Sequence, residues 1–320
     1  MPSDSSAPAA SRLPRAVAIA GAVLVGALTA LQAQINGALG AALDDALVAS
    51  AISFGSGFLI LLVLSAVLPG GRAGIVRLGR GVRSRQVPGW MLLGGLAGAF
   101  TVFTQGVTVA VIGVAAFTVG LVAGQTVNGI VLDRVGYGPA GVVGITWGRL
   151  AGALLVVAAV AVSLVGDGAS GIPLWMLLLP FLAGAGVAWQ QATNGRLRHV
   201  VGSPLTATLV NFAGGSIVLV LAAVIHVAVA GAVPALPGEL WLYVGGAIGV
   251  VYIFLSAALV RHLGVLQLGL GSVVGLLTTS VVLDVIAPAH AGAPLIVALA
   301  AVVIAIAGVV IAVVPRWRRR

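Results

Sequence analysis

A short polar segment at the end of a long apolar run occurs twice in this chain. The first copy is Gln32-Ala33-Gln34-Ile35-Asn36-Gly37 and the second is Gln190-Gln191-Ala192-Thr193-Asn194-Gly195, so that the two Asn-Gly pairs lie 158 positions apart (194 − 36). Other matches share this spacing or one of 151 (245 − 94): Phe54 with Phe212, Gly94 with Gly245, Gly113 with Gly264, and Asp133 with Asp284. The chain is therefore a duplication of one unit of about half its length.

The composition indicates whether the duplicated unit is surrounded by water or by lipid. Hydrophobic residues make up 60% of the 320 residues and charged residues only 7%, with a mean hydropathy of +1.20. Soluble proteins carry about 25% charged residues, so this chain cannot cover a water-facing surface. Its apolar runs are too long for the strands of a membrane barrel and lack their alternation. We expect an all-α integral membrane protein.

A transmembrane helix needs about 20 mainly apolar residues, and each half of the chain offers five such stretches. In the first half we expect spans at about 16–34, 46–68, 89–111, 114–132 and 140–165, and in the second half at about 173–192, 204–229, 239–260, 263–286 and 293–314. Only Gly113 or Gly264 separates the third span of each half from the fourth, which predicts a tight hairpin. The expected organisation is a disordered tail at 1–15, repeats at 16–166 and 172–315, and a basic tail at 316–320.

The basic residues test this arrangement of ten spans. With a cytoplasmic N-terminus, 15 of the 16 arginines fall in cytoplasmic segments, and only Arg149 lies within a span. This is the positive-inside pattern, and it places the C-terminus in the cytoplasm as well. The arginines lie beside membrane ends and lack interleaved aromatic residues, which argues against a nucleic-acid partner.

An odd number of helices per copy means that the two copies enter the membrane from opposite sides. Two inverted five-helix repeats are a recurrent plan of secondary transporters, in which the substrate site lies near the midplane where the repeats meet. The plan also predicts alternating access, because the inverted copies can exchange conformations.

Primary amides are the first candidates for substrate binding. They both donate and accept hydrogen bonds, which suits a polar neutral or zwitterionic solute. The amides of the duplicated segment are Gln32, Gln34, Asn36, Gln190 and Asn194. The alternative is an ordinary helix end, at which Asn-Gly turns the chain. Further candidates lie deeper in the spans, where helix-to-helix hydrogen bonds or packing are the alternative: Gln105, Gln125, Asn128, Asn211 and Tyr252.

Charged groups near the spans are candidates for gating or charge selection. Asp133 and Asp284 are repeat equivalents that each end a fourth span, either as gate residues or as solvated helix ends. Arg149 follows Pro139 by ten residues, which places it ~12 Å into the expected fifth span at 1.5 Å per residue. An intramembrane charge suggests function, with Asp133 as a partner or an anionic substrate, although arginine can also snorkel to the surface. His226 near the outer end of the seventh span is a further titratable group.

Several function classes are excluded. The chain has no Gly-Lys-Ser/Thr phosphate loop, no His/Asp/Glu cluster with metal spacing and no cysteine. Its few carboxylates are too scattered to form an acid–base pair. We expect neither an enzyme nor a cofactor.

The amide segment, the Phe- and Gly-rich second span and the Gly-Gly-x-x-Gly third span resemble a known family. They are similar to the YdcZ-type inner-membrane proteins of the drug/metabolite transporter (EamA-like) superfamily, here as a fused pair over about residues 16–314. The resemblance implies an exporter and no particular substrate class. The small multidrug resistance branch carries a glutamate in its first helix for coupling. The first span of this chain has no acidic residue, so that mechanism does not carry over.

These inferences predict a secondary transporter, an exporter of a small metabolite or drug-like solute. Two alternatives remain open at this point. A translocase of lipids or lipid-linked sugars would need a cavity that opens sideways to lipid. A non-transporting scaffold or regulator would have every polar group hydrogen-bonded and no midplane cavity. The expected partners are a small-molecule substrate and the lipid bilayer; an oligomer is not required, and the coupling ion is undetermined.

Overall fold

The computed structural model describes residues 14–137, 141, 142, 144, 146–162, 173–231, 234–287 and 294–313. Within these ranges the side chains of residues 15, 149, 160, 257, 258, 260–270, 312 and 313 are not described. The basic tail expected at 316–320, and all but the last two residues of the tail expected at 1–15, lie outside the described residues.

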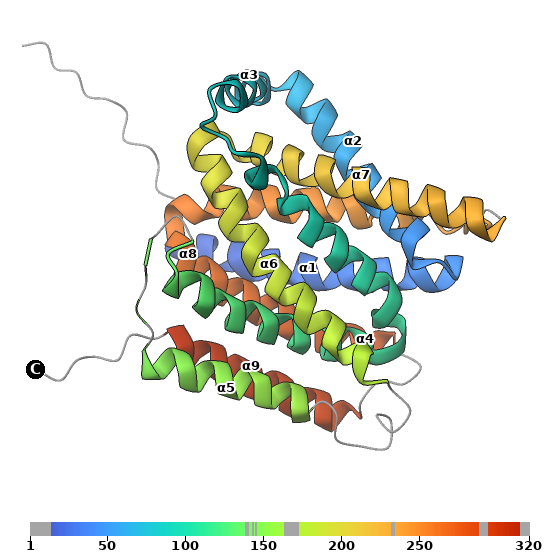
Figure 1. Ribbon diagram of the computed structural model, residues 1–320. Coiled ribbons are helices and arrows are strands. Elements are labelled where there is room, and N and C mark those ends of the chain that lie inside the picture. Colours follow the sequence, from blue (N-terminus) through green and yellow to red (C-terminus); the bar gives the residue numbers. More distant parts are fainter. Residues whose placement is uncertain are drawn as a thin grey trace, which may run out of the picture.

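The described residues form helices and contain no strand (Figure 1). The α-helices are α1 (Arg15–Leu43), α2 (Ala46–Val67), α3 (Pro69–Arg83), α4 (Gly94–Arg134), α5 (Trp147–Val162), α6 (Leu174–Val201), α7 (Pro204–Ala230), α8 (Gly245–Ile286) and α9 (Leu295–Val313). Short 3₁₀ helices, η1 (Gly89–Leu92) and η3 (Leu240–Tyr243), precede α4 and α8. Among the described residues, five helical segments are long and apolar enough to cross a membrane: 16–43, 46–67, 89–134, 174–201 and 204–230. The all-helical fold is confirmed, whereas ten spans and the orientation of the termini stay predictions.

Gly113 divides α4 into two parts, as the sequence predicts. Its backbone angles, φ 85° and ψ 161°, are not helical and lie in a region that only glycine enters at little cost. In Figure 1 the teal part of α4 runs to the right of the molecule, and the green part runs back to the left.

The helix boundaries correct two expectations. Asn36-Gly37 does not turn the chain, because α1 continues to Leu43; likewise α6 continues past Asn194-Gly195 to Val201. The tendency of Asn-Gly to end a helix is weak, and packing between helices overrides it. In α1 the residues beyond Asn36-Gly37 pack on α4, because Gly40 lies directly against the backbone of Gly106. The helix expected from residue 140 begins only at Trp147, after Gly141 with its φ of 72°. Arg149 is therefore in the first turn of α5 and not ten residues into a span.

The packing of the helices follows the duplication. The first helix of each repeat packs on the long helix of the other repeat, α1 on α8 and α6 on α4. The remaining equivalent helices pack on each other, α2 on α7 and α5 on α9, the latter two side by side in Figure 1. The two repeats are thus related by an approximate two-fold axis and are intertwined, so that neither forms a separate domain.

Four glycines bring these intertwined helices into backbone contact. A Cβ on Gly26 would overlap the carbonyl oxygen of Ser272, and one on Gly275 would overlap that of Val23. At the equivalent contact, a Cβ on Gly184 would overlap the carbonyl oxygen of Leu121, and one on Gly124 that of Phe181. Small residues at helix interfaces permit this close approach, which membrane helices need because lipid supplies no hydrophobic force between them.

We expect Gly124→Ala to lower the melting temperature of the purified protein measured by intrinsic fluorescence. The added methyl group must push α6 away, and such overpacking costs about 1–3 kcal/mol. The control is Gly129→Ala on the same helix, where a Cβ would meet no atom within 4 Å. Equal melting of both variants would show that this backbone contact does not hold the two helices together.

Candidate functional site

Three buried amides from the first repeat form a cluster beside the start of α8. The Nδ2 of Asn36 donates to the Oε1 of Gln105 at 2.6 Å, which joins α1 to α4. The Nε2 of Gln32 donates to the carbonyl oxygen of Gly245 at 2.9 Å and thus reaches the second repeat. We call Gln32, Asn36 and Gln105 the first amide cluster.

The second repeat builds a similar cluster on α6 and α7, in which two of the three amides are repeat equivalents of those in the first. The Oδ1 of Asn211 accepts from the Nε2 of Gln190 at 2.8 Å and from the Nδ2 of Asn194 at 3.1 Å. We call Gln190, Asn194 and Asn211 the second amide cluster. In each cluster two amides lie four residues apart on one helix, so they share a face one turn apart.

A glycine of the opposite repeat lies directly against each cluster. The position that a Cβ would take on Gly94 lies 2.7 Å from the Oδ1 of Asn194, and a Cβ on Gly245 would overlap the Oδ1 of Asn36. The duplicated Gly-Gly pair at the start of each long helix therefore leaves room for the amides.

Two polar atoms in and beside the first cluster have no hydrogen-bond partner among the described residues. They are the Oδ1 of Asn36 and the Oγ of Ser53, and both are buried. Ser53 is the repeat equivalent of Asn211 (211 − 158), so a short hydroxyl stands where the second cluster has an amide. A buried polar atom without a partner costs about 1–3 kcal/mol, and a ligand that supplies a donor would recover that cost.

Two phenylalanine rings lie between the clusters. Phe54 and Phe212 stack with their centroids 4.7 Å apart and an angle of 27° between the ring planes. These residues are repeat equivalents, so their contact lies on the approximate two-fold axis. The Cζ of Phe54 is 2.9 Å from the Cβ position of Gly98, which is 2.6 Å from the Nε2 of Gln190. On the other side, the Cβ position of Gly249 is 3.5 Å from the Cζ of Phe212 and 2.5 Å from the Nε2 of Gln32.

Four of the predicted binding residues lie elsewhere. The Nδ2 of Asn128 donates to the carbonyl oxygen of Ala185 at 2.6 Å, and Gln125 is half-buried at the same contact of α4 with α6. Gln34 is half-buried and lies two residues from both Gln32 and Asn36 on α1. Helix positions two residues apart do not share a face, so Gln34 is on a different face of α1 from the cluster. Tyr252 packs with Ala18, Ala22, Val25 and Leu259 in a separate apolar cluster.

Asp284 caps a helix of the other repeat. Its two carboxylate oxygens accept from the backbone N–H groups of Val114, at 2.7 Å, and Ala115, at 2.9 Å. These donors begin the second part of α4 just after Gly113, where a negative charge also complements the helix dipole. Its repeat equivalent Asp133 is half-buried near the end of α4, and the side chain of Arg149 lies outside the described residues.

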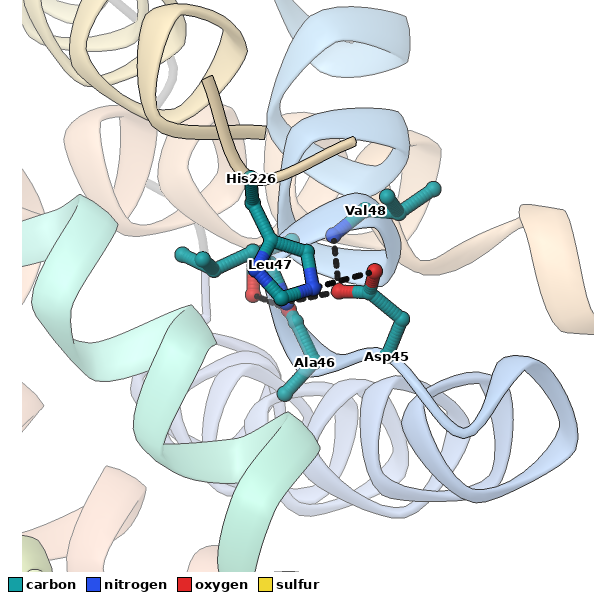
Figure 2. Close-up of polar contacts among 6 residues, drawn as sticks. Asp45, Ala46, Leu47, Val48 and His226 are labelled. Atoms are coloured by element: carbon teal, nitrogen blue, oxygen red, sulfur yellow. Dashed lines mark hydrogen bonds and ion pairs between the residues drawn. The ribbon is translucent and has the colours of Figure 1, made fainter. Parts of the chain in front are cut away.

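Different polar contacts join the helices at the two ends of the bundle. At one end, the Nε2 of His226 on α7 lies 3.2 Å from the Oδ2 of Asp45, whose Oδ1 accepts from the N–H groups of Leu47 and Val48 at the start of α2 (Figure 2). At the other end, the guanidinium of Arg196 lies 5.0 Å from the ring centroid of Tyr137 and 5.7 Å from that of Trp90.

Sequence reasoning assigned no role to Phe54, Phe212 or Arg196. The two phenylalanines served only as markers of the duplication, and only the structure shows that they contact each other. The partners of Arg196 come from η1 and the end of α4, and no local pattern connects them.

One protein family matches both halves of the chain. A family model described as "Putative inner membrane exporter, YdcZ" matches residues 17–162 and again residues 175–311. A comparison with curated proteins found no match. One similar solved structure, described as "Crystal structure of protein", is 22% identical over 94% of this chain and 97% of its own, with a TM-score of 0.47. The two family matches, one in each half, confirm the fused two-repeat form.

We expect Asp284→Ala to lower the free energy of unfolding by about 1–2 kcal/mol, because two N–H groups lose their acceptor. Thermal denaturation of the purified protein measures this. Asp44→Asn is the control, since Asp44 is exposed and its φ of 49° suits asparagine. If Asp284→Ala melted like the parent protein but lost transport, the residue would act as a gate and not as a cap.

Proposed function

The chain belongs to the YdcZ family of inner membrane exporters, and we propose on this premise that it moves a small polar solute by alternating access between its two repeats. The family is one of exporters and not of enzymes, and the chain is a multi-pass protein of the inner membrane. The proposed solute is neutral or zwitterionic, because both clusters consist of amides, which donate and accept hydrogen bonds without carrying a charge.

The observation that carries this proposal is the placement of two similar amide clusters, one from each repeat, on either side of an aromatic pair on the axis. Because the site is nearly symmetric, it could open to one side of the membrane and then to the other. The stacked rings of Phe54 and Phe212 separate the clusters, and moving one ring would connect them. The unpaired Oδ1 of Asn36 and Oγ of Ser53 are the atoms that we expect to accept hydrogen bonds from the solute.

The strengths of the contacts favour switching between two states. Hydrogen bonds between membrane helices contribute only about 0.6 kcal/mol each, so a solute amide or hydroxyl can replace them at little cost. The two ends also close by different contacts, His226 with Asp45 at one and Arg196 with Tyr137 and Trp90 at the other. Each end can therefore open while the other stays closed.

Binding is tested by a thermal-stability screen of the purified protein with metabolites, cationic dyes and anions at two pH values. A ligand that binds the folded state at a hundredfold excess over its Kd stabilises it by about 2.7 kcal/mol. We expect polar neutral or zwitterionic hits that are lost in Gln105→Ala and Asn211→Ala and retained in Asn128→Ala. Asn128 is the matched control, because it is also an interhelical amide but belongs to neither cluster.

Two outcomes would contradict the proposed site. Hits retained in both cluster variants would place binding elsewhere, and hits lost equally in Asn128→Ala would reflect general loosening of the fold. Stabilisation only by lipids would favour the translocase alternative, whose substrate never leaves the bilayer.

The aromatic pair makes a separate prediction for transport. We expect Phe54→Ala to make solute flux into proteoliposomes leaky and weakly saturable, because the barrier between the clusters is lost. The control is Phe58→Ala, one turn further on the same helix, where the ring is half-buried against the same apolar core. Saturable transport at the parental rate in Phe54→Ala would exclude the stack as a barrier.

A further inference from the structure

Helix α3 has no counterpart in the second repeat. It occupies residues Pro69–Arg83 between α2 and η1, whereas the described residues of the corresponding segment, 231 and 234–239, form no helix. The spacing between the repeats shortens across this region from 158 to 151 positions. Because the common transporter plan does not require α3, the helix calls for an explanation of its own.

One face of α3 holds it against the bundle. Gly71 lies on the backbone of Ser65, Gly74 lies on Ser203 and Thr206, and a Cβ on Gly81 would be 2.8 Å from Val87. The Nε of Arg77 donates to the carbonyl oxygen of Val201 at 2.6 Å, at the end of α6. In Figure 1 α3 is seen nearly end-on at the upper left, while α1, α7 and α8 run across the picture. It therefore lies across the ends of the long helices and not parallel to them.

The exposed surface of α3 combines apolar and basic residues in stripes, with the apolar stripe next to the packed face and the basic one farther from it. Ile75 and Val82 are seven residues apart and share one stripe, with 40% and 44% of their surface exposed. Arg72 and Arg83 are eleven residues apart, share the next stripe and are exposed, as is Arg80. No acidic residue occurs between Asp45 and Asp133, so these positive charges have no carboxylate near them in sequence.

This pattern matches the headgroup region of a membrane. A helix that faced only water would not expose Ile75, Val76 and Val82. A basic amphipathic helix in the membrane plane buries its apolar stripe at the boundary of the acyl chains and attracts anionic lipids with its basic stripe. The position of α3, directly after the apolar helix α2 and across the helix ends, places it at that boundary.

We propose that α3 is a binding site for anionic phospholipids, in which Arg72, Arg80 and Arg83 contact the phosphate groups while Ile75 and Val82 insert among the acyl chains. Arg77 has a different role, because its Nε and Nη2 donate to the carbonyl oxygens of Val201 and Gly202 at the end of α6. The lipid site would therefore lie beside the contact that joins α3, which continues from the first repeat, to a helix of the second repeat.

The test measures lipid binding to the purified full chain by native mass spectrometry, with phosphatidylglycerol and phosphatidylcholine as probes. We expect tighter binding of phosphatidylglycerol, and about a hundredfold weaker binding in the triple variant Arg72→Gln/Arg80→Gln/Arg83→Gln, since each basic residue near an anionic surface contributes about a fivefold factor. The control, Arg318→Gln/Arg319→Gln/Arg320→Gln, removes the same charge from the C-terminal segment and should bind like the parent.

A second variant tests the apolar stripe. Ile75→Asn/Val82→Asn keeps every charge, and we expect it to weaken phosphatidylglycerol binding at both low and high salt, whereas the effect of the arginine variant should shrink as salt screens the charges. Equal affinity for the two lipids would overturn the proposal. So would equal losses in the two arginine variants, because binding would then follow net charge and not α3.

Discussion

The contact of backbone with backbone at four glycines is the constraint on which the rest of the structure depends. Lipid gives helices no hydrophobic reason to associate, so association relies on close packing and on hydrogen bonds between helices. Gly26 and Gly275 join α1 to α8, and Gly184 and Gly124 join α6 to α4. Because each contact connects one repeat to the other, the packing that stabilises the fold also creates the interface that contains the amide clusters.

The duplication is symmetric in its framework and asymmetric in its polar groups. The glycines and the stacked phenylalanines obey the approximate two-fold relation closely. The clusters differ at two pairs of equivalent positions: Ser53 stands where the second cluster has Asn211, and Ser256 stands where the first cluster has Gln105. Ser53 leaves an oxygen without a partner among the described residues, whereas Asn211 accepts two hydrogen bonds. In the proposed alternating access the two repeats exchange environments, so this difference would make the two states unequal in energy.

Several of the few charged residues stabilise the ends of helices. Asp284 and Asp45 cap helices, and Arg77 bonds to the end of α6. The exposed arginines of α3 differ, because they have an apolar stripe beside them, as a helix at the bilayer surface would. The described capping carboxylates and Arg77 act at helix ends, while neutral amides occupy the interior, where an unpaired charge would be costly.

The sequence alone determined the features that depend on local composition and on self-comparison. Long apolar runs imply helices in lipid, and the repeated segments imply duplication. A glycine at position 113 between two apolar runs predicts a break, and the structure has one there, with a backbone conformation that costs little energy only for glycine. The amides of both clusters were all among the predicted residues. Tertiary structure decided where α1 and α6 end, that residues 69–83 form a helix, and which amides meet. Packing between the repeats overrides the weak local preference of Asn-Gly for a turn. The sequence near Asn128 does not indicate that its amide will donate to the carbonyl oxygen of Ala185, because that residue is distant in the chain.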